Sequence, residues 1–156
     1  MELESLSHLI YASVATQRFE AVELNELLTK SRAANELAGL TGMLLYAEAD
    51  RSFFQVLEGA PEPIERLLQK LRLDERHGHL TVIIREPIAD RSFKEWTMGF
   101  ASVTPESLNE IPGLNDFFQN GSCFTDLDTG RAKKLLAAFA EGRWRSKHLG
   151  AKWTAA

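Results

Sequence analysis

The stretch LTGMLLYAEADRSFFQVLEG, residues 40–59, decides the fold of this chain. It holds two apolar runs, Leu40–Tyr46 and Ser52–Glu58, on either side of a polar turn at residues 49–52. Two runs of strand length around a polar turn predict a β-hairpin. The first run is apolar almost throughout, which is typical of a strand in the interior of a sheet.

Helical and apolar segments flank the hairpin on both sides. A helical repeat precedes it at residues 19–37, and a second helix is expected near Pro61, because the first turn of a helix accepts proline. Further strands are predicted at residues 6–13, 80–84 and 96–100. The order βαββαββ predicts an α+β fold of the ferredoxin-like type, with one mixed sheet and two helices on one face.

The character of the chain changes after Phe100, where proline and glycine become frequent. Helical segments are still predicted at residues 106–118 and 129–142. Because the first two helices cover only one face of the sheet, we expect these segments to cap the other. The expected division is a domain at residues 1–102 and a helical extension at residues 103–156 that packs on the sheet and ends in a basic tail.

Composition and charge narrow the classes of function. A chain of 156 residues is long enough for one domain with a substantial core. The formal net charge of −4 argues against a nucleic acid partner, which favours a basic surface. The single cysteine, Cys123, has no internal disulfide partner, the histidines lack the spacing of a metal site, and no apolar run would span a bilayer. We therefore expect a cytoplasmic protein without metal or membrane role.

Three polar side chains stand where apolar ones are expected. Tyr11 and Gln55 alternate with apolar neighbours on their strands, and Asn35 lies on the inward stripe of the first helix. A buried polar group left unpaired costs about 1–3 kcal/mol, so each of them needs a partner. Either these groups satisfy one another and the backbone, or a polar ligand lies between helix and sheet. The three together favour the ligand.

Several strings of this sequence match a known family in their order along the chain. They are LIYAS at residues 9–13, SRAAN at 31–35, GLTGMLLY at 39–46, FFQVLEG at 53–59, DERH at 74–77 and RSFKEWTMGF at 91–100. Together they resemble the BLUF domain, a blue-light sensor that uses FAD, over residues 6–102. A single string would be weak evidence, and their order carries the resemblance.

The resemblance implies a flavin, either FAD or else FMN or riboflavin, held without a covalent bond between the two helices. It assigns flavin contacts to Tyr11, Leu27, Ser31, Asn35, Gln55, Arg76 and His77. It also implies photochemistry rather than enzyme catalysis. After blue-light excitation, Tyr11 would donate an electron and then a proton, and Gln55 would rearrange its hydrogen bonds.

A signal must then leave the flavin site. The resemblance assigns this relay to Trp96 and Met98, which we expect on the same side of the last strand. The output would be a light-dependent change in contacts between copies of this chain, as a homo-oligomer, or with a separate signalling protein.

Structural readings stay open for several of these residues. Arg76 and His77 follow a helix and would also suit the capping of its last carbonyl groups. Trp96 and Met98 are equally ordinary core residues.

Other functions stay open as well. An acylphosphatase-like hydrolase of similar fold would hold a phosphate with Arg76 and Asn35, although residues 14–18 lack the glycine of an anion-binding loop. A DNA-associated regulator would use the basic tail around Arg143–His148, but such a charge run is more often a solvated terminus.

Overall fold

A mixed sheet of five strands, in the order β4-β1-β3-β2-β5, forms the centre of the structure. The computed structural model describes residues 5–17, 19–114, 117–118 and 121–141. Its elements are β1 (Ser7–Ala15), α1 (Ala21–Ala38), β2 (Thr41–Ala47), β3 (Ser52–Gly59), α2 (Pro61–Leu73), β4 (His77–Pro87), β5 (Gly99–Val103), α3 (Pro105–Leu108), the short 3-10 helix η1 (Phe124–Asp126) and α4 (Thr129–Ala140).

The predicted hairpin is confirmed in β2 and β3, which pair antiparallel. At the turn, the Asp50 carboxylate accepts hydrogen bonds from the backbone N–H of Ser52 at 3.0 Å and from its hydroxyl at 2.5 Å. β1 lies on the other side of β3, also antiparallel, with Tyr11 directly opposite Gln55. The strand pairing thus makes neighbours of the two polar residues that the sequence places on inward faces.

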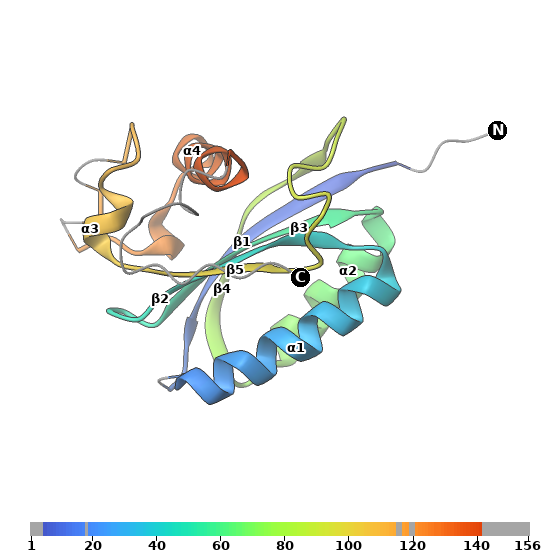
Figure 1. The fold of residues 1–156 in the computed structure, drawn as a ribbon, viewed down its shortest axis with the longest axis horizontal. Helices are drawn as coiled ribbons and strands as arrows, with labels where there is room; N and C mark the ends of the chain where they lie inside the picture. The colour runs from blue at the N-terminus through green and yellow to red at the C-terminus, as the bar shows by residue number, and fades with distance from the viewer. Residues whose placement is uncertain (1–4, 18, 115–116, 119–120, 142–156) are drawn as a thin grey trace.

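α1 and α2 cover one face of the sheet (Figure 1). α1 ends at Gly39, which has a left-handed φ of 71°, and the chain returns a backbone N–H to the Asn35 carbonyl. α2 begins at Pro61, as the sequence predicts. Leu28 and Leu68 are among the apolar side chains that the two helices bury against the sheet. Within the described residues, no helix is long and apolar enough to cross a membrane.

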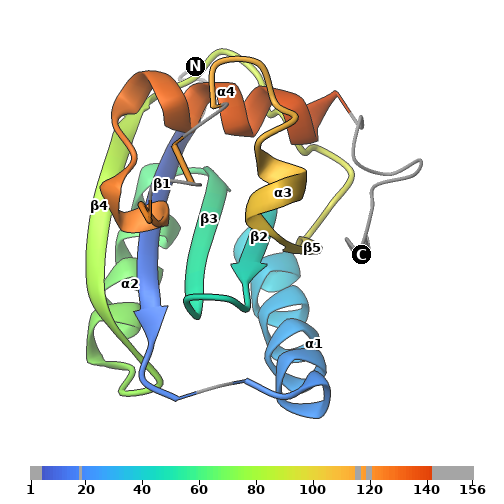
Figure 2. The same ribbon diagram turned by 90° about the vertical axis from the view of Figure 1, so that its left-hand side faces the viewer.

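The C-terminal segments cover the opposite face (Figures 1 and 2). Figure 2 shows α4 crossing the strands at one end of the sheet. Leu135 and Phe139 of α4 are fully buried, in the same core as Phe54 and Val56 of β3. The expected capping of this face is confirmed, and the basic tail beyond residue 141 lies outside the described residues.

The prediction of a long helix at residues 106–118 is wrong. α3 spans only Pro105–Leu108. Pro112 has no N–H for a helical hydrogen bond, and Gly113 adopts a left-handed φ of 91°. Turns replace the helix here, and Ile111 is still buried in the core on the α4 side.

The last strand begins later than predicted, at Gly99 instead of Trp96, and pairs parallel with β2. Side chains of α1 donate hydrogen bonds to the backbone carbonyl groups just before β5. Asn35 Nδ2 donates to the Thr97 carbonyl at 2.6 Å, and Arg32 Nε donates to the Met98 carbonyl at 2.9 Å. Residues 96–98 therefore form a bend that is fastened to α1.

Candidate functional site

A cavity of about 240 Å³ lies between α1, α2 and the sheet. Every residue predicted to contact a flavin lines it, namely Tyr11 and Gln55 from the sheet, Leu27, Ser31 and Asn35 from α1, and Arg76 and His77 from the segment after α2. The fold thus gathers at one place residues that the sequence disperses over strands, helices and a connection.

Three side chains form a hydrogen-bonded chain at this cavity. The Tyr11 hydroxyl donates to Gln55 Oε1, and Gln55 Nε2 donates to Met98 Sδ at 3.5 Å. Tyr11 is 3% exposed and Gln55 is 6% exposed. Cross-strand residues that lie directly opposite have adjacent side chains, which explains why the two meet. The polar groups of Tyr11 and Gln55 therefore satisfy one another, as one of the alternative readings holds.

Asn35 is a polar residue of the cavity wall that protein partners satisfy only in part. Its side chain is 2% exposed and sits in the last turn of α1. Its Nδ2 donates to the Thr97 carbonyl, but no donor among the described residues reaches Oδ1. An amide oxygen without a protein donor at the wall of a cavity is an acceptor available to a ligand N–H.

His77 belongs to β4, which starts earlier than predicted. Its Nε2 lies 2.9 Å from the Leu71 carbonyl and donates to it, because a carbonyl oxygen only accepts. Its Nδ1 lies 2.8 Å from the hydroxyl of Ser13, which also lines the cavity. His77 therefore does hold a carbonyl of α2, as the capping reading expects, while its ring remains in the cavity wall.

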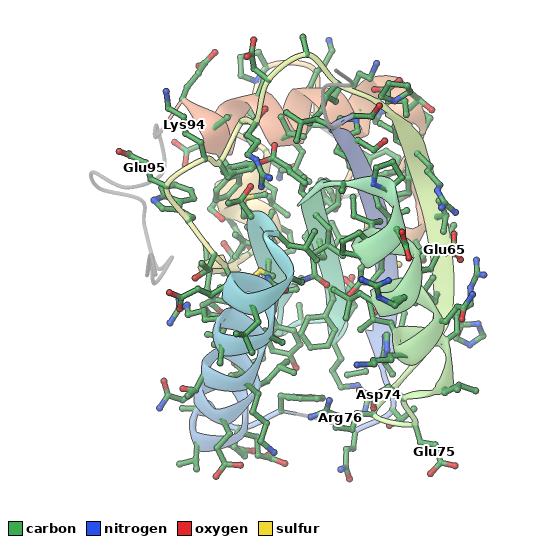
Figure 3. The ribbon with its side chains drawn as sticks, turned by 90° about the vertical axis from the view of Figure 1, so that its right-hand side faces the viewer. Glu65, Asp74, Glu75, Arg76, Lys94 and Glu95 are labelled. Atoms are coloured by element: carbon green, nitrogen blue, oxygen red, sulfur yellow. The ribbon has the colours of Figure 1, made fainter. Side chains whose placement is uncertain are left out.

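Arg76 is held by a neighbour that the sequence reading overlooked. Its Nε and Nη2 donate to the Asp74 carboxylate, with Nη2 at 2.6 Å from Oδ2 (Figure 3). The pair lowers the pKa of Asp74, chiefly through the hydrogen bond from Arg76. Nη1 has no hydrogen-bond acceptor among the described residues, so part of the guanidinium remains available to a ligand in the cavity.

Two electrostatic features mark the cavity: the Tyr11 phenol stays neutral, and positively charged side chains predominate among the lining residues. Burial, with a smaller contribution from the negative charge of Asp74, raises the pKa of the Tyr11 phenol. Lys30 of α1 and Lys70 of α2 line the cavity together with Arg76, and both lysines are exposed. Asp74 is the acidic residue among the lining side chains, so cations predominate.

The prediction that Trp96 and Met98 share one side of a strand is wrong. Met98 is fully buried in the core beneath α1 and α2, whereas Trp96 packs in the core on the α4 side and stacks on Phe93 at 5.5 Å. The bend before β5 separates them, because alternation of faces applies only to extended strand residues. Met98 contacts Gln55, but neither Met98 nor Trp96 lines the cavity.

Sequence reasoning missed several lining residues. They are Ser13, Phe19, Lys30, Ala34, Leu44, Phe53, Leu67, Lys70, Leu71 and Asp74. Periodicity contains a signal for some of them: Lys30 follows Leu27 by three positions, and Lys70 follows Leu67 by three, which sets each pair on one face of its helix. The apolar residues carry no such signal, because an apolar cavity wall and an apolar core have the same composition.

Together, fold and cavity define a small ligand-binding domain in which a bound molecule would lie against buried amides and a phenol. The chain belongs to the BLUF family, the sensors of blue light using FAD. The family model matches residues 6–99.

Individual relatives agree with this membership. The chain is 32% identical to photoactivated adenylate cyclase subunit beta of Euglena gracilis over 127 residues. The match covers 80% of this chain and 14% of that protein. It therefore spans about a seventh of the length of this curated relative. Among solved structures, the photo-activated state of BlsA matches at 31% identity with a TM-score of 0.73, covering 86% of this chain and 94% of that one. The dark state of BlrB matches at 25% identity with a TM-score of 0.72, covering 90% and 99%.

Family membership decides between the alternatives. The BLUF domain is a photosensor and not an enzyme, so the hydrolase reading is not favoured. The residues present also fit the flavin that the family binds. Apolar side chains from both helices and the sheet, including Leu27, Leu67 and Phe53, offer walls for a flat ring, and polar side chains line the same cavity.

Proposed function

We propose that this chain senses blue light through a rearrangement of Gln55 between Tyr11 and Met98. The observation that carries the proposal is the hydrogen-bonded chain that runs from the Tyr11 phenol and the Gln55 amide, both at the cavity wall, to the Met98 thioether. A bound flavin would supply light absorption and an acceptor for one electron. Everything else in the proposal is done by side chains of this protein.

Tyr11 is proposed as the donor of the electron and of the proton. Because its pKa is raised, the buried phenol keeps its proton at neutral pH and releases it only when an electron is also lost. The Gln55 amide oxygen is placed to receive that proton, since the hydroxyl already donates to it. No other residue of the cavity wall combines an oxidisable ring with a hydrogen bond to Gln55 among the described side chains.

Gln55 is proposed as the switch, because its amide has a donor end and an acceptor end. If the amide turns over, Nε2 faces Tyr11 and Oε1 faces Met98. The Tyr11 hydroxyl can accept as well as donate, so it adapts to the change. The thioether sulfur is only an acceptor, so it loses its hydrogen bond and the contact with Met98 changes.

Met98 and Trp96 are proposed as the relay, in an arrangement that differs from the predicted one. They are two residues apart, yet Met98 lies on the cavity side of the sheet and Trp96 on the α4 side. A displacement of Met98 would therefore reach the opposite face through the backbone of residues 96–98. This placement favours an output at the C-terminal segments, as a changed contact with a second copy or with a separate signalling protein.

FAD is proposed as the flavin, with FMN or riboflavin as alternatives. Asn35 Oδ1 would accept the imide N–H of the ring, and Leu27 and Ser31 would line it. Lys30, Lys70 and Arg76 favour a flavin that carries phosphate, because phosphate oxygens accept hydrogen bonds from such cations. We also propose a flavin-binding unit at residues 1–102 with an extension at 103–156, and a cytoplasmic location.

An absorption spectrum in darkness and under blue light tests the proposal. We expect a flavin spectrum that shifts to the red on illumination and recovers in darkness, with the shift lost in Gln55→Leu. Gln69→Leu is the matched control, because Gln69 is exposed on α2 and lies outside the cavity wall. A protein that takes up no flavin when FAD is supplied, or a Gln55→Leu variant with the full reversible shift, would refute it.

A further inference from the structure

A row of polar residues crosses the sheet on the face opposite the cavity. Thr41, Glu58, His8 and Glu86 are cross-strand partners in succession, on β2, β3, β1 and β4. Glu58 is the most enclosed of them, with an exposed fraction of 0%. A carboxyl group in the interior is retained only where hydrogen bonds compensate for the loss of water.

The Glu58 carboxylate accepts hydrogen bonds from three donors. Thr41 Oγ1 donates to Oε1 at 3.0 Å, the backbone N–H of Phe93 donates to Oε1 at 3.0 Å, and the backbone N–H of Ser92 donates to Oε2 at 2.6 Å. Two of these donors belong to the connection between β4 and β5. Glu58 therefore fastens the middle of that connection to the end of β3.

Arg91, the residue before Ser92, adds hydrogen bonds between the same connection and the strands β2 and β3. Its guanidinium donates to the carbonyl groups of Glu58 at 3.1 Å and Gly39 at 3.0 Å, and to the Thr41 hydroxyl at 2.9 Å. Together, Arg91 and Glu58 join the connection to β2, β3 and the end of α1. This polar arrangement is separate from the cavity, since neither residue lines it.

The fastened connection is the one that carries Met98. After Phe93, the Trp96 N–H bonds to the Phe93 carbonyl, and the Gly42 N–H bonds to the Trp96 carbonyl, both at 3.0 Å. The chain then bends, and Met98 Sδ reaches Gln55 Nε2. Glu58 thus holds residues 92 and 93 on one side of the bend that carries Met98, and α1 holds residues 97 and 98 through Asn35 and Arg32.

We propose that Glu58 is a positioning residue of the light response, because it holds the connection that seats Met98 against Gln55 and thereby governs the lifetime of the lit state. The inference rests on the proposed roles of Gln55 and Met98. Return to the dark state requires Met98 to resume its place at Gln55. A released connection has more conformations to search, so recovery slows.

The test is the rate of dark recovery in flavin-loaded Glu58→Gln. The substituted amide keeps one acceptor oxygen but turns an N–H₂ group toward the Ser92 N–H, so one hydrogen bond is lost. We expect recovery to slow by about fivefold or more, the size of effect that the loss of a charge-assisted hydrogen bond can have on a rate. Glu62→Gln is the matched control, because Glu62 is an exposed residue of α2 that pairs with Arg66.

Two further variants separate positioning from general damage to the fold. Arg91→Gln removes the outer fastening without changing a buried carboxylate, and we expect a smaller slowing in the same direction, even if Glu58→Gln fails to fold. In a Met98→Leu background, Glu58→Gln should change the recovery rate little, because the two residues act on one contact. A purely structural role would instead lower the unfolding temperature and leave the effects of the two substitutions additive.

The outcomes distinguish this inference from the proposed function. Wild-type protein without a reversible red shift would refute the proposed function and this inference with it. A normal wild-type photocycle, with recovery of Glu58→Gln and Arg91→Gln within about twofold of wild type, or with additive effects in the Met98→Leu background, would overturn the role of Glu58 alone.

Discussion

Replacement of Tyr11 with phenylalanine removes one oxygen atom and the hydrogen bond that it donates to Gln55. Both side chains are buried, and no other described side chain donates to Gln55 Oε1, so its protein partner is lost. A buried acceptor left unpaired costs about 1–3 kcal/mol, whereas the retained ring leaves almost no cavity. We therefore expect Tyr11→Phe to lower the free energy of unfolding by about 1–3 kcal/mol and to abolish the reversible red shift.

The double variant with Gln55→Leu tests the assigned cause. Replacement of both partners by apolar groups of similar shape is nearly neutral, so Tyr11→Phe should cost far less when Gln55 is already leucine. We expect a coupling energy of about 1–2 kcal/mol between the two substitutions.

The assay is urea unfolding of the wild type, both single variants and the double variant at one fixed flavin concentration, because a bound ligand adds to stability. The midpoint should move while the slope m stays constant. Strictly additive losses, or a Tyr11→Phe variant as stable as wild type, would show that the phenol–amide bond carries no net energy.

Three further predictions concern charge and packing. Because the pKa of Tyr11 is raised, the folded chain keeps a proton that the unfolded chain loses, so stability is full below about pH 10 and then falls by up to about 1.4 kcal/mol per pH unit. Urea unfolding at rising pH checks this, and an equally steep decline in Tyr11→Phe would contradict it. Joint replacement of Lys30 and Lys70 by alanine should weaken FAD binding by about threefold to tenfold, since each exposed ion pair contributes little, and should leave riboflavin binding unchanged. Fluorescence titration with each flavin measures this, and equal losses for both flavins would speak against a phosphate contact. Gly99→Ala would set a Cβ 2.7 Å from the Trp96 ring, so we expect a loss of about 1–3 kcal/mol and altered tryptophan fluorescence, and an unchanged unfolding midpoint would contradict the packing argument.

The elements that sequence reasoning located well are those set by short-range chemistry. The hairpin follows from two apolar runs around a polar turn, and α1 follows from the helical repeat predicted at residues 19–37. The inward direction of Tyr11 and Gln55 follows from strict alternation along a strand. Local periodicity was enough in each of these cases.

The errors arise where a distant segment competes for the backbone. Trp96 and Met98 alternate as strand residues would, but Asn35 and Arg32 of α1 take the carbonyls of Thr97 and Met98 and bend the chain there. The donors lie more than sixty positions away in sequence, so no local pattern predicts these hydrogen bonds. The pairing of Asp74 with Arg76 was not predicted for a different reason. Two charged residues two positions apart in a connection can adopt many geometries, and only some of them bring the side chains together.

The sequence by itself determined the order of the elements, the faces of the first strands and the residues that could carry a flavin response, because side-chain chemistry and periodicity are written in it directly. Tertiary structure alone decided that Tyr11 and Gln55 stand opposite each other, and that Met98 and Trp96 lie on different faces. It also alone placed the Glu58 carboxylate beneath the connection that carries them. These facts depend on strand register and on hydrogen bonds between remote segments, which form only when the sheet and its two layers assemble.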